Sequence, residues 1–338
     1  MKKNGKIEFL RFAFAATIMV FHYPAFVNIT ETAQIGVEFF YIIMGAFMAR
    51  KIVAESNKDI VDSTVKYILG KAISFYKYFL PAFVIKTFLT AIGENLGVLS
   101  VLDRLVISIP QLLFLNSLGF HPDTYAGAIY VPASWFLSSA LICLFVIYPI
   151  AKQDWKRFVR IIAPIIVIFS ASYLYMNFGT ILVHYNFVNG VNVALLRTVM
   201  DLAIGCICFE VAQEIGVKVS NNKYVGWVEG ILYVIVFLSI IKETPATIEV
   251  SILICLAVAV TLTISRMDKK SIFNNKFFYF LGRMSVPLYL LHCLVIQSML
   301  LAYDDIQNWT MFLVFVGISI TGAALWTIIT GKIFDKKA

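Results

Sequence analysis

Apolar runs of about twenty residues alternate with short polar segments along the whole chain. A helix of about twenty residues spans the hydrocarbon core of a bilayer. The pattern therefore predicts an all-α, polytopic membrane helix bundle, in which any chemistry is carried by side chains within or just above the bundle. Ten membrane-spanning helices are expected at 8–27, 35–53, 72–92, 134–151, 161–178, 195–214, 226–241, 247–265, 277–300 and 309–332.

One further apolar segment, 101–120, contains Arg104, Pro110 and Gln111 and could be an eleventh span, a re-entrant segment or an interfacial one. With ten spans and a cytoplasmic N-terminus, most of the 28 Lys and Arg residues lie on the cytoplasmic side. This asymmetry follows the positive-inside rule, and an eleventh span would largely remove it by reversing every later loop. We therefore expect both termini in the cytoplasm and 101–120 at the outer side.

Composition excludes several other classes of protein. Of the 338 residues, 60% are hydrophobic and only 14% are charged, which is too apolar for a soluble domain. The net charge of +8 does not indicate a nucleic-acid partner, because the basic residues lie in short loops between spans. The five cysteines all lie in apolar segments without CxxC spacing, and the four histidines have no metal-ligand spacing. We expect one membrane domain over 1–338, no appended soluble domain and no metal.

The first expected span carries two polar side chains, Arg11 and His22. An offset of eleven residues is close to three helical turns, so both lie on one face, roughly 16 Å apart along the axis. Ionisable side chains within a span are candidate functional residues. His22, two residues before Pro24, could be a general base that takes a proton from a hydroxyl, or a hydrogen-bonded core histidine. Arg11 could anchor phosphate groups of a cytoplasmic ligand, or simply extend to the interface.

Three other polar positions are candidates for the same site. Glu38 opens the second span and needs a partner; the short preceding loop makes it a neighbour of His22, whose imidazole it could orient. It could equally only hold the helix ends together. Arg197 and Asp201, at i and i+4, form an expected intramembrane pair, from which Arg197 could also contact substrate. Trp135 is either a sugar-stacking platform or part of the interfacial aromatic belt.

These motifs together resemble a known family. Arg11, ten residues, His22 and then the run Gly36-Val-Glu-Phe-Phe is similar to acyltransferase family 3, a group of polytopic membrane acyltransferases. Matches continue in order through Ser134-Trp-Phe-Leu, Leu196-Arg197 with Asp201, and the segment 282–292. The resemblance implies transfer of an acyl group, usually acetyl from cytoplasmic acetyl-CoA, to a hydroxyl of a surface polysaccharide or its lipid-linked precursor. It implies that His22 is catalytic and that Arg11 helps to hold the coenzyme.

One departure concerns the coenzyme. The family often carries Arg-x-x-Arg before a proline at the start of the third span, whereas here Lys71 and Lys77 precede Pro81. Lysine binds phosphate as a point charge, so both lysines are expected to contact acetyl-CoA. His292 is expected to have a packing role. The expected location is the plasma or inner membrane of a bacterium. The alternative is a transporter of a glycan precursor or small polar solute, although the two halves lack an inverted-repeat pattern of interrupted helices.

Overall fold

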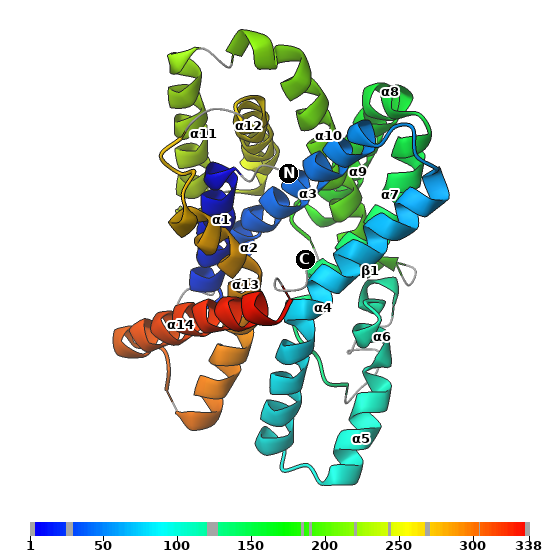
Figure 1. Ribbon diagram of the computed structural model, residues 1–338. Helices are drawn as coiled ribbons and strands as arrows, with labels where there is room; N and C mark the ends of the chain where they lie inside the picture. Colours follow the sequence, from blue (N-terminus) through cyan, green and yellow to red (C-terminus); the bar gives the residue numbers. More distant parts are fainter. Residues whose placement is uncertain are drawn as a thin grey trace.

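The computed structural model describes residues 4–24, 30–119, 128–183, 186–188, 191–219, 222–242, 245–267, 271–303 and 305–334. The described part is almost entirely helical (Figure 1). Its strands, β1 (Phe187–Val188) and β2 (Val191–Asn192), pair antiparallel in a short hairpin. The longer helices are α1 (Gly5–Phe21), α3 (Ile35–Ala54), α4 (Ile60–Gly93), α7 (Ser134–Gln153), α9 (Ala163–Phe178), α10 (Val193–Val219), α11 (Lys223–Ile241), α12 (Ala246–Ser265), α13 (Lys276–Ala302) and α14 (Trp309–Phe334). The shorter ones are α2 (Thr30–Ala33), α5 (Val98–Ile107), α6 (Ile109–Leu112), η2 (Asn116–Leu118), α8 (Trp155–Arg157) and η3 (Phe158–Ile162).

Each of the ten expected spans overlaps an observed helix, which confirms the all-α fold. Seven helices in the described ranges are long and apolar enough to cross a membrane: α4, α7, α8 to α9 taken together, α11, α12, α13 and α14. Several of them expose most of their apolar side chains, and only 22% of the α4 window and 28% of the α14 window are buried within the protein. These surfaces are suited to contact with lipid.

The helix α1 is shorter than the expected span 8–27. It has 17 residues and ends at Phe21, with His22 as its C-cap. Pro24 explains the early end, since the residue before a proline is disfavoured in helical conformation and proline itself lacks an amide donor. A helix of this length is about 26 Å long, somewhat less than the hydrocarbon core. The position of His22 at the end of α1 therefore leaves its side chain at the border between helix and loop.

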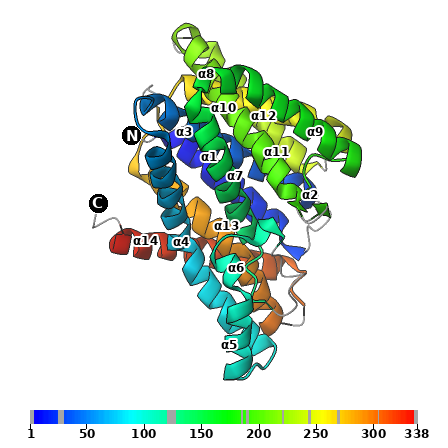
Figure 2. The same ribbon diagram turned by 90° about the vertical axis from the view of Figure 1, so that its right-hand side faces the viewer.

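The segment 101–120 does not form a spanning helix. It is divided among α5, α6 and η2, and α5 has only ten residues, or about 15 Å. Together with the second half of α4 it forms a hairpin that projects from one end of the bundle (Figure 2). The buried Gln111 ties the segment to α7, because its amide donates to the Ser134 hydroxyl at 2.6 Å. The break is consistent with the expectation that this segment does not cross.

Glycines let the central helices approach closely. Gly45 of α3 lies against the backbone of Leu202, and Gly205 of α10 lies against the backbone of Ile42. A Cβ atom at either glycine would overlap the facing carbonyl group, so the α3–α10 crossing requires both. On the other side of the bundle, α1 runs beside α13. Of these four helices, α1, α3 and α13 line the two cavities of the candidate site, and α10 does not.

The start of α1 is fixed at its N-terminus by polar contacts. The Asn4 side chain accepts from the amides of Lys6 and Ile7 at 3.0 and 3.2 Å, which caps the helix. Its amide group donates to the Met267 carbonyl at 3.1 Å. Lys6 forms a 2.6 Å ion pair with the buried Glu229 of α11. These contacts set the rotation of α1 and hence the direction in which its polar side chains point.

Candidate functional site

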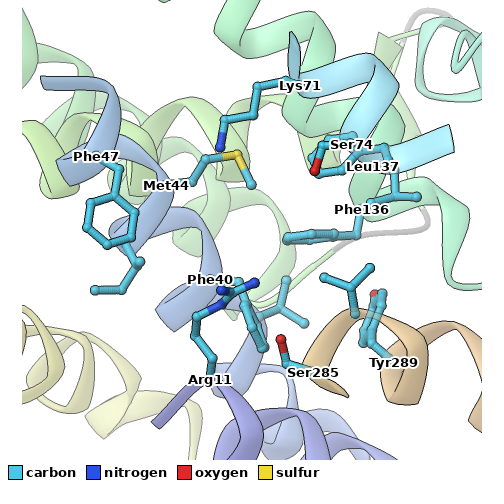
Figure 3. Close-up of a pocket in the computed structure, with 14 residues that line it drawn as sticks. Arg11, Phe40, Met44, Phe47, Lys71, Ser74, Phe136, Leu137, Ser285 and Tyr289 are labelled. Carbon is cyan, nitrogen blue, oxygen red and sulfur yellow. The ribbon is translucent and has the colours of Figure 1, made fainter. Parts of the chain in front are cut away.

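A cavity of about 160 Å³ lies between α1, α3, α4, α7 and α13. We call it the Arg11 cavity. Figure 3 shows Arg11 from α1 and Lys71 from α4 pointing into it from two sides, with Ser285 and Tyr289 of α13 along a third. The remaining lining is mostly apolar and aromatic: Val37, Phe40, Ile43, Met44, Phe47, Ser74, Phe75, Phe136, Leu137 and Val286. The cavity is thus an apolar space with two cationic groups.

The cations at this cavity are only partly neutralised. Arg11 pairs at 3.0 Å with Glu8, which lies three residues earlier on the same helix. The ammonium groups of Lys51 and Lys71 lie 5.3 and 5.7 Å from the ring centre of Tyr67, within the range of cation–π attraction. Two cations, Arg11 and Lys71, and no carboxylate stand among the residues that line the cavity. A polyanionic ligand would complete the charge balance.

The two predicted coenzyme-binding lysines differ in position. Lys71 lines the Arg11 cavity, whereas Lys77 is not among its lining residues. Six residues correspond to about 240° of helical rotation, so the two side chains leave α4 on different faces. The ammonium group of Lys77 lies 5.5 Å from the ring centre of Tyr78 instead. The geometry supports the predicted role of Lys71 and gives no support to that of Lys77.

A second cavity, of about 50 Å³, lies at the end of α1. We call it the His22 cavity. Val37 and Tyr289 line both cavities, so the two spaces are neighbours separated by these side chains. The other lining residues of the His22 cavity are Ile18, His22, Gln34, Pro132, Ala133, Trp135, His292 and Cys293. The helix α1 therefore presents Arg11 to one cavity and His22 to the next.

The His22 ring is held by its own helix. Its Nδ1 atom lies 2.7 Å from the carbonyl oxygen of Ile18. Because a carbonyl oxygen only accepts hydrogen bonds, this contact assigns the hydrogen of the neutral ring to Nδ1. The lone pair is then on Nε2. Such a tautomer leaves one nitrogen available as a base.

The neighbour of His22 is a second histidine. The rings of His22 and His292 have centres 4.9 Å apart and an interplanar angle of 62°. His292 comes from α13, is 1% exposed, and places Nε2 3.1 Å from the Cys293 sulfur. The expected packing role is therefore incomplete, because His292 also lines the cavity. The segment 282–292, which is similar to a segment of acyltransferase family 3, was the sequence signal that could have identified His292 as a site residue.

The carboxylate of Glu38 contacts Arg197 and not the His22 ring. Arg197 Nε donates to Glu38 Oε1 at 2.7 Å, and the two side chains are 0% and 1% exposed. The guanidinium also donates to the Gln34 and Leu182 carbonyls at 2.9 and 2.8 Å. Glu38 does not line the His22 cavity. Of the two alternatives for Glu38, the geometry favours the one in which it holds helix ends together.

The expected ion pair between Arg197 and Asp201 is replaced by this contact. The salt bridge of Arg197 reaches across to α3, while Asp201, fully buried in α10, interacts electrostatically with both Arg197 and Glu38. Helical spacing places Asp201 about one turn from Arg197, but the α3–α10 crossing brings the Glu38 carboxylate into direct contact with the guanidinium. Arg197 lines neither cavity, so its predicted contact with substrate has no support from this geometry.

Trp135 connects Arg197 to the cavity. The guanidinium carbon of Arg197 lies 5.8 Å from the ring centre of Trp135, in cation–π range. Trp135 is 3% exposed and lines the His22 cavity. It is therefore inside the bundle and not in a surface aromatic belt. The Arg197 guanidinium therefore packs against a side chain of the cavity wall.

Among the described residues no group of three or more His, Cys, Asp or Glu side chains could hold a metal ion. His121 and His184 lie outside the described residues. No protein-family model, curated protein or solved structure matches the chain.

Proposed function

We propose that the chain is a membrane O-acyltransferase that moves an acetyl group from acetyl-CoA to a hydroxyl of a surface polysaccharide or its lipid-linked precursor. One observation carries the proposal. A single helix, α1, presents a cation to the mostly apolar Arg11 cavity, and His22 at its end presents an imidazole to the adjacent, smaller cavity. This arrangement suits a reaction in which a phosphate-bearing donor and a hydroxyl acceptor meet at a base. The resemblance of the motifs to acyltransferase family 3 points the same way.

The donor would occupy the Arg11 cavity. Arg11, Lys51 and Lys71 would bind the phosphates of acetyl-CoA, the guanidinium as a fork and the ammonium groups as point charges. The apolar lining would hold the thioester arm and exclude water from it. The acetyl end would then reach Tyr289, which borders the His22 cavity.

At the His22 cavity, Nε2 of His22 would take the proton of the acceptor hydroxyl. The oxygen would attack the thioester carbonyl, forming a C–O bond as the C–S bond breaks. The CoA thiolate would recover the proton from the imidazolium, so that atoms and charge balance. In an alternative reaction order, Nε2 first takes the acetyl group as the CoA thiolate leaves, and then passes it to the acceptor hydroxyl.

Topology gives the site a direction. We propose that all ten expected spans cross the bacterial plasma or inner membrane, with both termini in the cytoplasm. Arg11 then faces the cytoplasmic supply of acetyl-CoA, and His22 lies toward the outer side, where the glycan acceptor is found. The concentration of basic residues in the presumed cytoplasmic loops supports this orientation.

The test is turnover by the purified chain in lipid nanodiscs. Acetyl-CoA together with polysaccharide from the source cells should yield free CoA and acetylated glycan, both measured by mass spectrometry. His22→Ala should abolish both products, while Thr17→Ala, on the same helix, should retain them. A folded His22→Ala variant with full activity would refute the catalytic assignment. Folded wild-type protein that releases no CoA would instead favour the transporter alternative.

A further inference from the structure

The small size of the His22 cavity bears on the acyl group itself. Resting on the proposed function, we infer that the His22 cavity is the acyl pocket and that Ile18 and Val37 restrict the donor to a two-carbon acyl group. The resemblance to a family leaves the acyl length open. The structure provides a physical reason for one length, because the reacting carbonyl has to reach His22.

His22 lines only the smaller of the two cavities. A thioester held in the Arg11 cavity must therefore extend its acyl end past Val37 and Tyr289, the side chains common to both. The acceptor oxygen has to reach the same carbonyl, since the new C–O bond forms as the C–S bond breaks and the hydroxyl proton passes through His22 to the CoA thiolate. The acyl group and the acceptor oxygen must share the small cavity.

The volume permits that only for a short acyl group. The His22 cavity, at about 50 Å³, has less than a third of the volume of the Arg11 cavity, at about 160 Å³. The acyl group and the attacking oxygen compete for this small space, so each methylene added to the acyl chain reduces what is left for the acceptor.

The walls of the cavity have little freedom to move outward. Ile18 and Val37 are each 1% exposed. A Cβ atom at Gly36 would lie only 3.0 Å from Ile18 Cγ1, so α1 and α3 are already in close contact behind Ile18. The Tyr289 ring is held between Phe136 and His292, with ring centres 5.5 and 5.8 Å away. Close packing on both sides makes the limit on length steric.

The test compares acetyl-CoA, propionyl-CoA and butyryl-CoA as donors, with polysaccharide from the source cells as acceptor. The informative variant is Val37→Ala, which removes two methyl groups from the wall of the His22 cavity. Its matched control is Val286→Ala, since Val286 lines only the Arg11 cavity. Ile18→Val, a smaller change in the same wall, replaces Val37→Ala if that variant fails to fold.

The wild type should prefer acetyl-CoA to butyryl-CoA by about 100-fold or more in kcat/KM, given that one methylene in a tight pocket is worth about 10–200-fold. Val37→Ala should narrow that preference at least tenfold, and Val286→Ala should leave it unchanged. Equal use of butyryl-CoA by the wild type, or equal narrowing by both valine variants, would overturn the inference. A wild type that releases no CoA from any donor would refute the proposed function itself.

Discussion

Replacing Glu38 by alanine leaves the guanidinium of Arg197 buried without its ion-pair partner. The pair is 2.7 Å long, and its side chains are 0% and 1% exposed. Removing one member of a buried ion pair costs about 3–5 kcal/mol, because the remaining charge is left without compensation. Arg197 would keep its hydrogen bonds to two backbone carbonyls and its electrostatic interaction with Asp201. We therefore expect the lower end of that range, about 3 kcal/mol, in the free energy of unfolding.

A double-mutant cycle separates this structural role from a catalytic one. Arg197→Met alone should also destabilise, since it leaves the Glu38 carboxylate buried. Glu38→Ala combined with Arg197→Met removes both charges and should recover much of the loss that the unpaired charges cause. The free energy of unfolding is measured by denaturant titration in detergent micelles, with CoA release followed on the same preparations. A coupling energy within about 0.5 kcal/mol of zero would refute the argument that the pair acts as one unit.

Activity provides the second readout of the same perturbation. Glu38→Gln keeps a hydrogen-bond acceptor at nearly the same place but removes the negative charge. If Glu38 acts through Arg197 and Trp135, CoA release by the Gln variant should fall only in proportion to its loss of folded protein. A Gln variant that is as stable as the wild type but inactive would show that Glu38 acts on His22 directly, contrary to the geometry.

Three further predictions follow from the fold and the cavities. Lys71→Ala should raise the KM for acetyl-CoA about tenfold, because about 1.4 kcal/mol of charge-assisted phosphate binding is lost; Lys66→Ala, exposed on the same helix, should leave KM unchanged. Gly45→Ala should destabilise the protein by about 1–3 kcal/mol, because the new methyl group overlaps the α10 backbone; thermal unfolding that matches the wild type would contradict the close crossing. A membrane-impermeant maleimide added to intact cells should label Ser100→Cys but not Gln153→Cys, and the reverse result would overturn the proposed orientation.

The sequence by itself determined the helices and the direction of their side chains. Apolar length and helical period are local properties, so all ten expected spans overlap observed helices, and Arg11 and His22 line adjacent cavities. The break in 101–120 also has a local cause, since a proline lies within it. Even the different faces of Lys71 and Lys77 follow from their spacing, although the family resemblance suggested a common role.

Only the tertiary structure decided which polar side chains meet. Sequence proximity suggested Glu38 as the partner of His22. The Glu38 carboxylate instead pairs with Arg197, which is 159 residues further along the chain. His292, far along the chain, lies beside His22 because α13 packs against α1. In a bundle of similar apolar helices the hydrophobic pattern does not specify neighbours. Two features select which helices become neighbours: close contacts at glycines, and the need of each buried charge for a partner. Neither can be predicted from the sequence of one helix alone.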